Sequence, residues 1–192
     1  MEVAKKMSNN TTFKEYVQPI LVLVAICLVI SFALAQTYGM TKPVIERITK
    51  ENADIARAVV LPTGADGFTE YEGEKIAGVT EYYVANNKSG VAVTAESKSF
   101  GGTMTVMVGV DQDGKVTGVT VTNHADTPGL GTKAMTVEYL SQYMGVESLS
   151  EEKIKNATEV DAITGATISS DGVYACVRLA LEQFNALGGV VE

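Results

Sequence analysis

The sequence predicts an α+β fold in which a single N-terminal transmembrane helix precedes an antiparallel sheet packed with helices. Three observations support this fold class. A 16-residue apolar run occupies positions 20–35, and alternating apolar residues broken by turn-forming residues fill positions 76–122. A helix-periodic apolar pattern begins at Ser170. The chain therefore combines a membrane anchor with one compact domain.

The membrane helix is predicted from the length and composition of the apolar run. Ser31 is the only polar residue within positions 20–35, and with its flanks the segment 17–38 covers 22 residues. At about 1.5 Å per residue it reaches roughly 33 Å, enough to cross a hydrocarbon core of about 30 Å. Tyr16 and Tyr38 would lie at the two membrane interfaces.

A cleaved signal peptide is the competing interpretation of the N-terminus. Lys5, Lys6 and Lys14 would form its basic region, and Ala33-Leu34-Ala35 resembles a small-residue cleavage site. The apolar run is long for the core of a signal peptide, so we favour a retained anchor. Lysine and arginine residues flank both ends of the run, so the charge bias leaves its orientation open.

The rest of the chain has the size and charge of one acidic domain. Residues 36–192 comprise 157 positions, enough for a single hydrophobic core. The chain carries a net charge of −8, and because residues 1–35 contribute +1 the remainder carries −9. An acidic domain without a basic patch argues against binding to nucleic acid. Cys27 and Cys176 lie in the anchor and the last helix, so no disulfide or iron–sulfur site is expected, and the single histidine cannot build a metal site.

The domain is expected to open with a helix that starts at Pro43 and packs an apolar stripe into the core; a stalk that continues the membrane helix is the alternative. The stripe comprises Val44, Ile45, Ile48, Ile55 and Val59. A loop at 62–73 then leads into a meander of antiparallel strands. The strands are expected at 76–85, 91–97, 103–110 and 116–122, joined by turns at 86–90 and 111–114.

Shorter elements are expected after the meander. They are short helices at 135–144 and 150–154 and a strand at 160–163. In the last helix the apolar side chains recur with the period of one helix face, and Ser169, Ser170 and Asp171 are residue types that cap helix N-termini. Cys176 is expected to be a small core residue of this helix.

The loop before the last helix has the features of an anion site. Residues 161–170 read Asp-Ala-Ile-Thr-Gly-Ala-Thr-Ile-Ser-Ser. Backbone N–H groups at a helix N-terminus and the positive end of the helix dipole attract anions. Gly165 and Ala166 leave room for a bulky ligand to approach the backbone. A threonine hydroxyl there could hydrogen-bond to a phosphate or be esterified to one. On composition alone, an ordinary helix cap is the simpler interpretation.

This loop resembles the flavinylation motif of the FMN-binding domain family, Asp-x-x-Thr-Gly-Ala-Thr-x-x-Ser. The family includes the G subunit of the Rnf complex and the C subunit of the sodium-pumping NADH:quinone reductase. The resemblance implies that Thr167 carries FMN through a phosphoester bond, installed by a flavin transferase that uses FAD. The other matching motif positions are Asp161, Thr164, Gly165, Ala166 and Ser170, and the resemblance implies that all of them except Asp161 bind FMN.

A second loop, residues 124–133, contains the turn-forming sequence Pro-Gly-Leu-Gly. It resembles the His-x-acid-Thr-Pro-Gly-Leu-Gly loop that lies against the flavin in the same family. The resemblance implies that the loop contacts FMN, with His124 as its first motif residue. The implied FMN-binding residues are Asp126, Thr127, Pro128, Gly129, Leu130, Gly131 and Lys133. Asp126 stands where glutamate is commoner in the family. The two motifs occur in the family's order, with Pro128 and Thr164 36 positions apart.

The resemblance implies an electron-transfer subunit with covalently bound FMN. The length of the chain, with one anchor, is closer to that of the Rnf G subunit than to that of the longer quinone-reductase subunit. The implied assembly is therefore a membrane ferredoxin:NAD⁺ oxidoreductase coupled to Na⁺ or H⁺ transport. The family's topology implies a cytoplasmic segment 1–16, a transmembrane helix 17–38 in the lipid bilayer and an extracytoplasmic FMN-binding domain 39–192. The implied partners are the other Rnf-type subunits and the flavin transferase.

Other interpretations of the function stay open. No residue pattern forms a nicotinamide or ferredoxin site, so the isolated subunit is expected to carry electrons without turning over NAD. One alternative is a flavinylated subunit of another membrane redox chain, such as the sodium-pumping quinone reductase or an extracellular reductase. The other is a non-enzymatic, membrane-anchored binding domain in which residues 164–170 only cap a helix.

Overall fold

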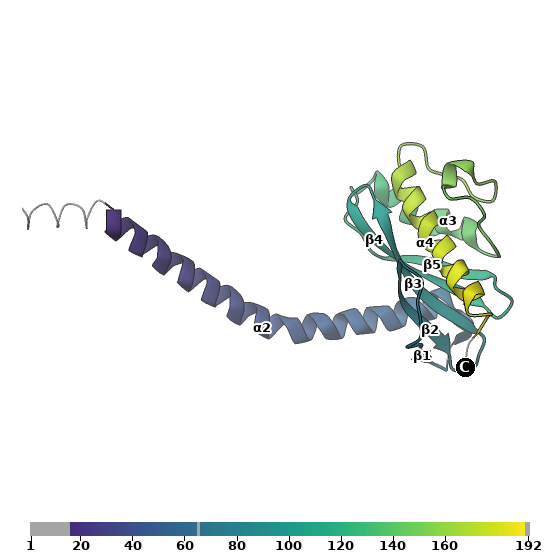
Figure 1. Cartoon of the computed structure of the whole chain (residues 1–192), viewed down its shortest axis with the longest axis horizontal. Helices are drawn as coiled ribbons and strands as arrows, with labels where there is room; N and C mark the ends of the chain where they lie inside the picture. Colours follow the sequence, from purple (N-terminus) through teal and green to yellow (C-terminus); the bar gives the residue numbers. More distant parts are fainter. Residues whose placement is uncertain (1–15, 65, 191–192) are drawn as a thin grey trace, which may run out of the picture. The chain divides into compact units, whose positions relative to one another are not determined.

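The computed structural model describes residues 16–64 and 66–190, drawn in colour in Figure 1. The described chain divides after Glu51 into an N-terminal unit and a larger unit that begins at Asn52. The N-terminal unit is helical throughout its described part. The larger unit contains the strands, the remaining helices and the core.

Helix α2 (Gln18–Val60) runs without interruption for 43 residues. Within the described residues it is the one helix long and apolar enough to cross a membrane. The prediction that a separate helix starts at Pro43 was wrong, because Pro43 lies inside α2, as the stalk alternative expected. A proline within a helix removes one backbone hydrogen bond, here the one to the Gly39 carbonyl, and α2 continues through that loss.

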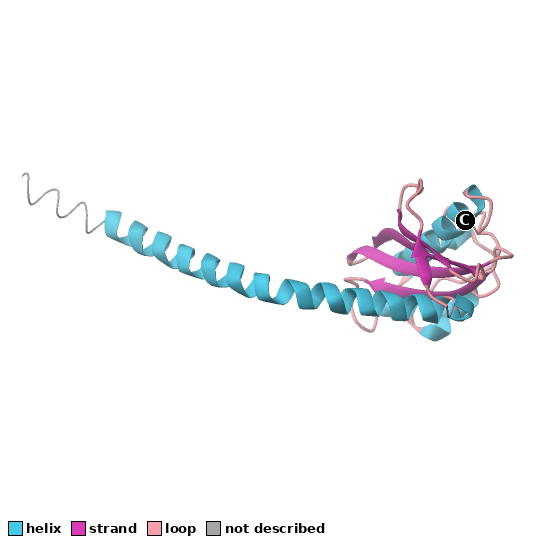
Figure 2. Cartoon of the chain, turned by 90° about the horizontal axis from the view of Figure 1, so that it is seen from below, coloured by secondary structure: helices cyan, strands magenta, loops and turns pink. Residues whose placement is uncertain are grey.

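In the described residues, five strands form one antiparallel sheet in the order β1-β2-β3-β4-β5. Figure 2 shows these strands in magenta, gathered into a single sheet. Their bounds are β1 Phe68–Glu70, β2 Val79–Ala85, β3 Gly90–Ser99, β4 Gly102–Asp111 and β5 Val116–Asn123. The meander is confirmed, and β3 and β4 pair over their whole lengths, from Gly90↔Asp111 to Ser99↔Gly102. Only β1 was missed; its three residues fall in the predicted loop and pair with the end of β2.

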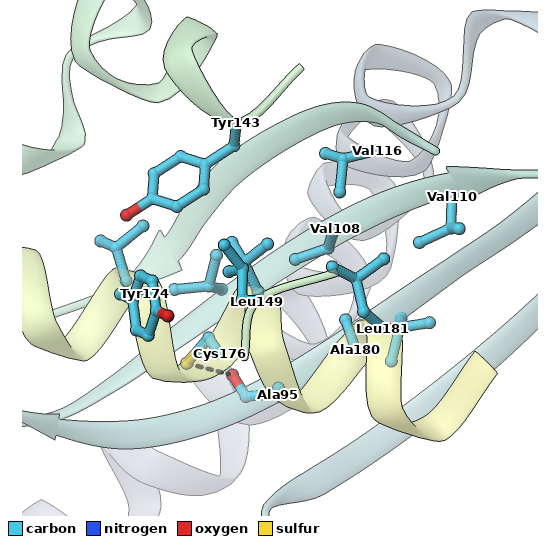
Figure 3. Close-up of a cluster of buried hydrophobic side chains, with 14 of the residues drawn as sticks. Ala95, Val108, Val110, Val116, Tyr143, Leu149, Tyr174, Cys176, Ala180 and Leu181 are labelled. Atoms are coloured by element: carbon cyan, nitrogen blue, oxygen red, sulfur yellow. Dashed lines mark hydrogen bonds between the residues drawn. The ribbon is translucent and has the colours of Figure 1, made fainter. Parts of the chain in front are cut away.

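Helix α4 (Thr167–Ala186) covers one face of the sheet and forms the main core with it. Side chains at alternate positions of β3 and β4, such as Val93 and Val108, face the buried side of α4, as the period of two requires. The Cys176 thiol lies 3.5 Å from the Ala95 carbonyl oxygen, which it faces in Figure 3. Burial raises the pKa of this thiol to about 11. The predicted core role of Cys176 is confirmed.

The end of α2 packs on the opposite face of the sheet. Val60 is fully buried against Ala92 and Met107, and its carbonyl oxygen accepts a 2.6 Å hydrogen bond from the Thr117 hydroxyl. The Arg57 guanidinium lies 3.7 Å from the centre of the Tyr83 ring, a cation–π contact. The prediction that the apolar stripe of this helix packs in the core was wrong. All five stripe residues are exposed. In the unit that contains the sheet, Ile55 and Val59 are exposed because the sheet receives the helix face of Ala56, Arg57 and Val60.

Two further predictions do not hold within the described chain. The helix expected at 150–154 is not formed; residues 150–153 are not helical, and a 3₁₀ turn, η5 (Ile154–Asn156), begins at Ile154. The strand expected at 160–163, which the structure also describes, is not formed. Side chains bind the backbone there: the Asp161 N–H donates to Gln142 Oε1 (2.7 Å) and the Ile163 N–H to Ser170 Oγ (3.1 Å). The helix expected at 135–144 divides into η3 (Gly131–Met135), α3 (Val137–Leu140) and η4 (Ser141–Tyr143).

Candidate functional site

Helix α4 begins at Thr167, three residues before the predicted start. Its N-cap is Ala166, which has no hydrogen-bonding side chain. The predicted caps lie inside the first turns and bind elsewhere: Ser170 Oγ accepts the Ile163 N–H and Asp171 Oδ1 accepts the Ile154 N–H. Because the first N–H groups of a helix lack intrahelical partners, the turn at Thr167 presents uncapped donors. This is the arrangement that favours a phosphate group.

The four hydroxyl residues of segment 161–170 differ in accessibility. Thr164 and Thr167 are exposed, whereas Ser169 and Ser170 are almost completely buried. A buried serine cannot receive a bulky group without opening the start of α4. Of the two exposed threonines, Thr167 lines the hollow described next and Thr164 does not. Among these four hydroxyl groups, that of Thr167 therefore belongs to the one residue that is both exposed and in the lining of the hollow.

A hollow of about 290 Å³ opens beside Thr167. Three separate segments line it: the turn between β3 and β4, the 124–133 loop and the start of α4. The lining residues are Phe100, Thr127, Leu130, Gly131, Gly165, Ala166, Thr167, Ile168 and Ser169. The two sequence motifs thus meet at one site. The hollow is near the small end of the range for ligand pockets, about 300–1,000 Å³.

Three lining residues were not predicted from the sequence: Ile168 and Ser169, which lie within the predicted motif segment, and Phe100, which lies outside both motif loops. Phe100 sits at the tip of the β3–β4 turn, and 68% of its surface is exposed. Leu130 and Ile168 are also exposed, so large apolar side chains from all three segments surround the hollow. A signal was present in the sequence, since an aromatic residue before Gly101-Gly102 is an apolar group at a turn.

Asp126 lies behind the hollow and does not line it. The side chain is only 4% exposed; its Oδ1 accepts the Gly101 N–H at 2.6 Å, and its Oδ2 accepts a hydrogen bond from the Ser99 hydroxyl. Burial by itself raises the pKa of Asp126. Hydrogen bonding by the Ser169 and Ser99 hydroxyls and the Gly101 N–H outweighs burial, so the pKa of Asp126 is lowered and the carboxylate stays charged.

The other predicted site residues have different positions. Pro128, Gly129 and Lys133 belong to the same loop and are exposed, but they are not lining residues. His124 and Asp161 are exposed outside the hollow. Among residues 16–64 and 66–190, no three histidine, cysteine, aspartate or glutamate side chains are grouped as a metal site would require.

The residues present fit a flavin nucleotide. Phe100, Leu130 and Ile168 offer apolar surface to a flat aromatic ring system. The uncapped start of α4 offers N–H donors to a phosphate, with an accessible hydroxyl at Thr167 beside them. The site therefore offers both apolar surface and anion-binding groups, as the ring system and the phosphate of FMN require.

Comparison with known proteins agrees with this chemistry. The sequence profile of the FMN-binding domain family matches residues 99–182, which include every residue lining the hollow. The fold and the site therefore define a protein of the FMN-binding domain class. Among solved structures, the crystal structure of Shewanella oneidensis NqrC is similar, with a TM-score of 0.44 and 23% identity, covering 55% of this chain and 57% of that one.

Three relatives extend the similarity over most of the chain. The G subunit of the proton-translocating ferredoxin:NAD(+) oxidoreductase complex of Clostridium ljungdahlii is 33% identical, covering 85% of this chain and 88% of the relative. The G subunit of the ion-translocating oxidoreductase complex of Methanosarcina acetivorans is 31% identical, with coverage of 92% and 98%. The Na(+)-translocating counterpart of Acetobacterium woodii is 31% identical, with coverage of 87% and 90%. The chain belongs to the family of G subunits of ion-translocating oxidoreductase complexes.

Proposed function

We propose that this protein is an electron-transfer subunit with covalently bound FMN in a membrane ferredoxin:NAD⁺ oxidoreductase complex coupled to Na⁺ or H⁺ translocation. The observation that carries the proposal is the position of Thr167. Its exposed hydroxyl stands at the uncapped start of α4, in the hollow where both motif loops meet. Membership of the G-subunit family supports the same role.

The proposed attachment is a phosphoester between Thr167 Oγ1 and FMN. A flavin transferase would join this oxygen to the flavin-side phosphorus of FAD, while the bond from that phosphorus to the AMP oxygen breaks and the hydroxyl proton goes to solvent. Burial of Ser169 and Ser170 supports the choice of Thr167 over its neighbours. The N–H groups at the start of α4 would then stabilise the phosphate charge.

When bound, FMN supplies the one- and two-electron redox chemistry. This chain's own residues bind, orient and shield it. Phe100, Leu130 and Ile168 would cover part of the ring system, and the hollow is open enough to leave the rest accessible to a redox partner. Within the complex, the chain would therefore pass electrons between partners rather than act as an isolated enzyme.

We further propose that residues 17–38 anchor the chain in the membrane, with residues 1–16 in the cytoplasm and the FMN-binding domain 39–192 outside. Helix α2 supports an anchor through its length and exposed apolar surface. A covalent link suits this location, because free FMN is scarce outside the cytoplasm and a lost cofactor could not be replaced. The partners would be the other subunits of the complex.

In-gel flavin fluorescence after full denaturation tests the proposal. The wild type, Thr167→Ala and Thr164→Ala would each be co-expressed with a flavin transferase. We expect fluorescent wild-type and Thr164→Ala bands and a dark Thr167→Ala band. Thr164→Ala is the matched control, because Thr164 is an exposed threonine of the same motif that does not line the hollow.

Dark bands for all three proteins would contradict the proposal, provided that the transferase modifies a control substrate. That outcome would favour the anchored binding domain instead. If the wild type is flavinylated, the subunits that co-purify with it distinguish a ferredoxin:NAD⁺ oxidoreductase from another membrane redox chain.

A further inference from the structure

We propose that Asp126 is a positioning residue for the flavin, which holds the Phe100 turn so that the phenyl ring forms one wall of the flavin site. This inference rests on the proposed function. It differs from the role expected from the sequence, in which Asp126 itself contacts FMN. The geometry points to an indirect role, because Asp126 is buried behind the lining residues.

Asp126 forms hydrogen bonds to both neighbours of Phe100. Its two carboxylate oxygens accept hydrogen bonds from the Ser99 hydroxyl and the Gly101 N–H, the residues on either side of Phe100. The backbone at Phe100 is therefore held at both ends by one side chain. With its neighbours fixed and its own side chain mostly exposed, Phe100 extends outward beside the hollow.

The Phe100 turn and the 124–133 loop approach each other closely. A Cβ atom at position 101 would lie 2.1 Å from the Ala125 carbonyl oxygen and 2.6 Å from the Asp126 nitrogen. The backbone of the turn therefore contacts the backbone of the 124–133 loop directly, with no space for a side chain between them. This contact and the two hydrogen bonds to Asp126 fix the turn relative to the loop that supplies Thr127 and Leu130 to the same hollow.

Asp126 also lies close to α4. Ser169 lines the hollow, and a Cβ atom at position 131 would lie 2.8 Å from both the Ser169 hydroxyl oxygen and Asp126 Oδ2, so these two side chains come together beneath Gly131. Asp126 is therefore close to all three segments that surround Thr167. Hydrogen bonds to a charged carboxylate are about twice as strong as neutral ones, so one buried charge can hold short, irregular segments in place.

The apolar surface that includes Phe100 indicates the class of ligand. Phe100 is a large aromatic side chain that stays exposed next to two further apolar side chains. A flat aromatic ring system can cover such a surface by stacking or edge contact. Within the proposed function, that ring system is the isoalloxazine of the FMN attached at Thr167.

Iodide quenching of flavin fluorescence in the native, full-length protein tests the inference. The variants are Phe100→Ala, Asp126→Ala and the double variant, with Asp171→Ala as the control. Asp171 also accepts a backbone N–H, but this N–H belongs to Ile154, which neither lines the hollow nor adjoins Phe100. Covalent flavin load would be measured on denaturing gels, and folding by thermal unfolding of the apo protein.

We expect every variant to keep its covalent flavin, because the Thr167 hydroxyl is unchanged. Phe100→Ala and Asp126→Ala should each raise the quenching constant severalfold, and the double variant should add little to either. Asp171→Ala should quench like the wild type. Non-additivity is the signature that a general loss of stability would not produce.

Wild-type quenching in a folded, flavinylated Asp126→Ala protein would overturn the inference, as would full additivity in the double variant. If Asp126→Ala does not fold, Phe100→Ala remains decisive, because its exposed side chain is not part of the core; unchanged quenching there would overturn the inference by itself. A wild type without covalent flavin would instead overturn the proposed function, so the two failures are distinguishable.

Discussion

The packing of α2 on the sheet leads to a prediction for Gly109→Ala. Gly109 and Gly118 lie opposite each other on β4 and β5, beneath the last residue of α2. A Cβ atom at position 109 would lie 2.1 Å from the Val60 carbonyl oxygen and 2.6 Å from the Thr117 hydroxyl. Because Val60 is fully buried, its backbone cannot yield without lifting the end of the helix from the sheet.

Two opposing effects determine the size of the change. Replacing a strand glycine by alanine ordinarily stabilises a protein by about 0.5–1 kcal/mol. Overpacking destabilises by about 1–3 kcal/mol, and losing the Thr117–Val60 hydrogen bond by about 1 kcal/mol. We therefore expect Gly109→Ala to lower the free energy of unfolding by about 1–3 kcal/mol. Gly118→Ala should have a smaller effect, since its Cβ would meet Val60 atoms at 2.9 Å.

Urea unfolding of the full chain in detergent micelles measures this difference. The signal would be near-ultraviolet circular dichroism, because the chain has eight tyrosines and no tryptophan. Gly39→Ala is the control, since a Cβ atom there meets nothing within 4 Å. An unchanged midpoint for Gly109→Ala, or a larger loss in Gly118→Ala, would refute the reasoning.

Two further predictions concern titratable groups. Because the pKa of Asp126 is lowered on folding, its contribution to stability is present above the unfolded value of about 3.9 and is lost as the pH falls through the folded value. The urea midpoint of Asp126→Asn should therefore fall less steeply than that of the wild type below about pH 4; parallel curves would contradict this. Burial raises the pKa of Cys176 to about 11, so its reactive thiolate is scarce at about pH 8 in the native protein. With Cys27 replaced by serine, the native protein should therefore resist a thiol reagent at that pH and react with it once unfolded. Rapid reaction of the native protein would exclude that packing.

Under the proposed function, attachment and shielding of the flavin depend on partly different segments. The start of α4 would provide the Thr167 hydroxyl, the N–H groups for the phosphate and the Ile168 side chain, whereas Phe100 and Leu130 come from two other segments. Variants of the Phe100 turn should therefore change the surroundings of the ring system while leaving the proposed covalent link in place. This separation is why the tests of Thr167 and of Asp126 have different readouts.

The sequence by itself determined the features that depend on neighbouring residues. The apolar run of α2, the alternation along β2 to β5 and the period of α4 are local patterns, because each follows from burying one face of a regular element. The two motif loops could be recognised for the same reason, since their residues are contiguous. Together they predicted the fold class, the family and two of the three segments that line the hollow; the turn that carries Phe100 was not predicted.

Tertiary structure alone decided which surfaces meet. The buried face of α2 contains Arg57, which a pattern of apolar residues does not include because its side chain is charged. In the structure the Arg57 guanidinium stacks on the Tyr83 ring, so this face of α2 packs against the sheet. The residues at 160–163 have strand-like composition, but side chains of Gln142 and Ser170 satisfy their backbone groups instead. The link from Asp126 to both neighbours of Phe100 joins positions 25 and 27 residues apart. Such contacts depend on how separate segments dock, and no periodicity within either segment encodes them.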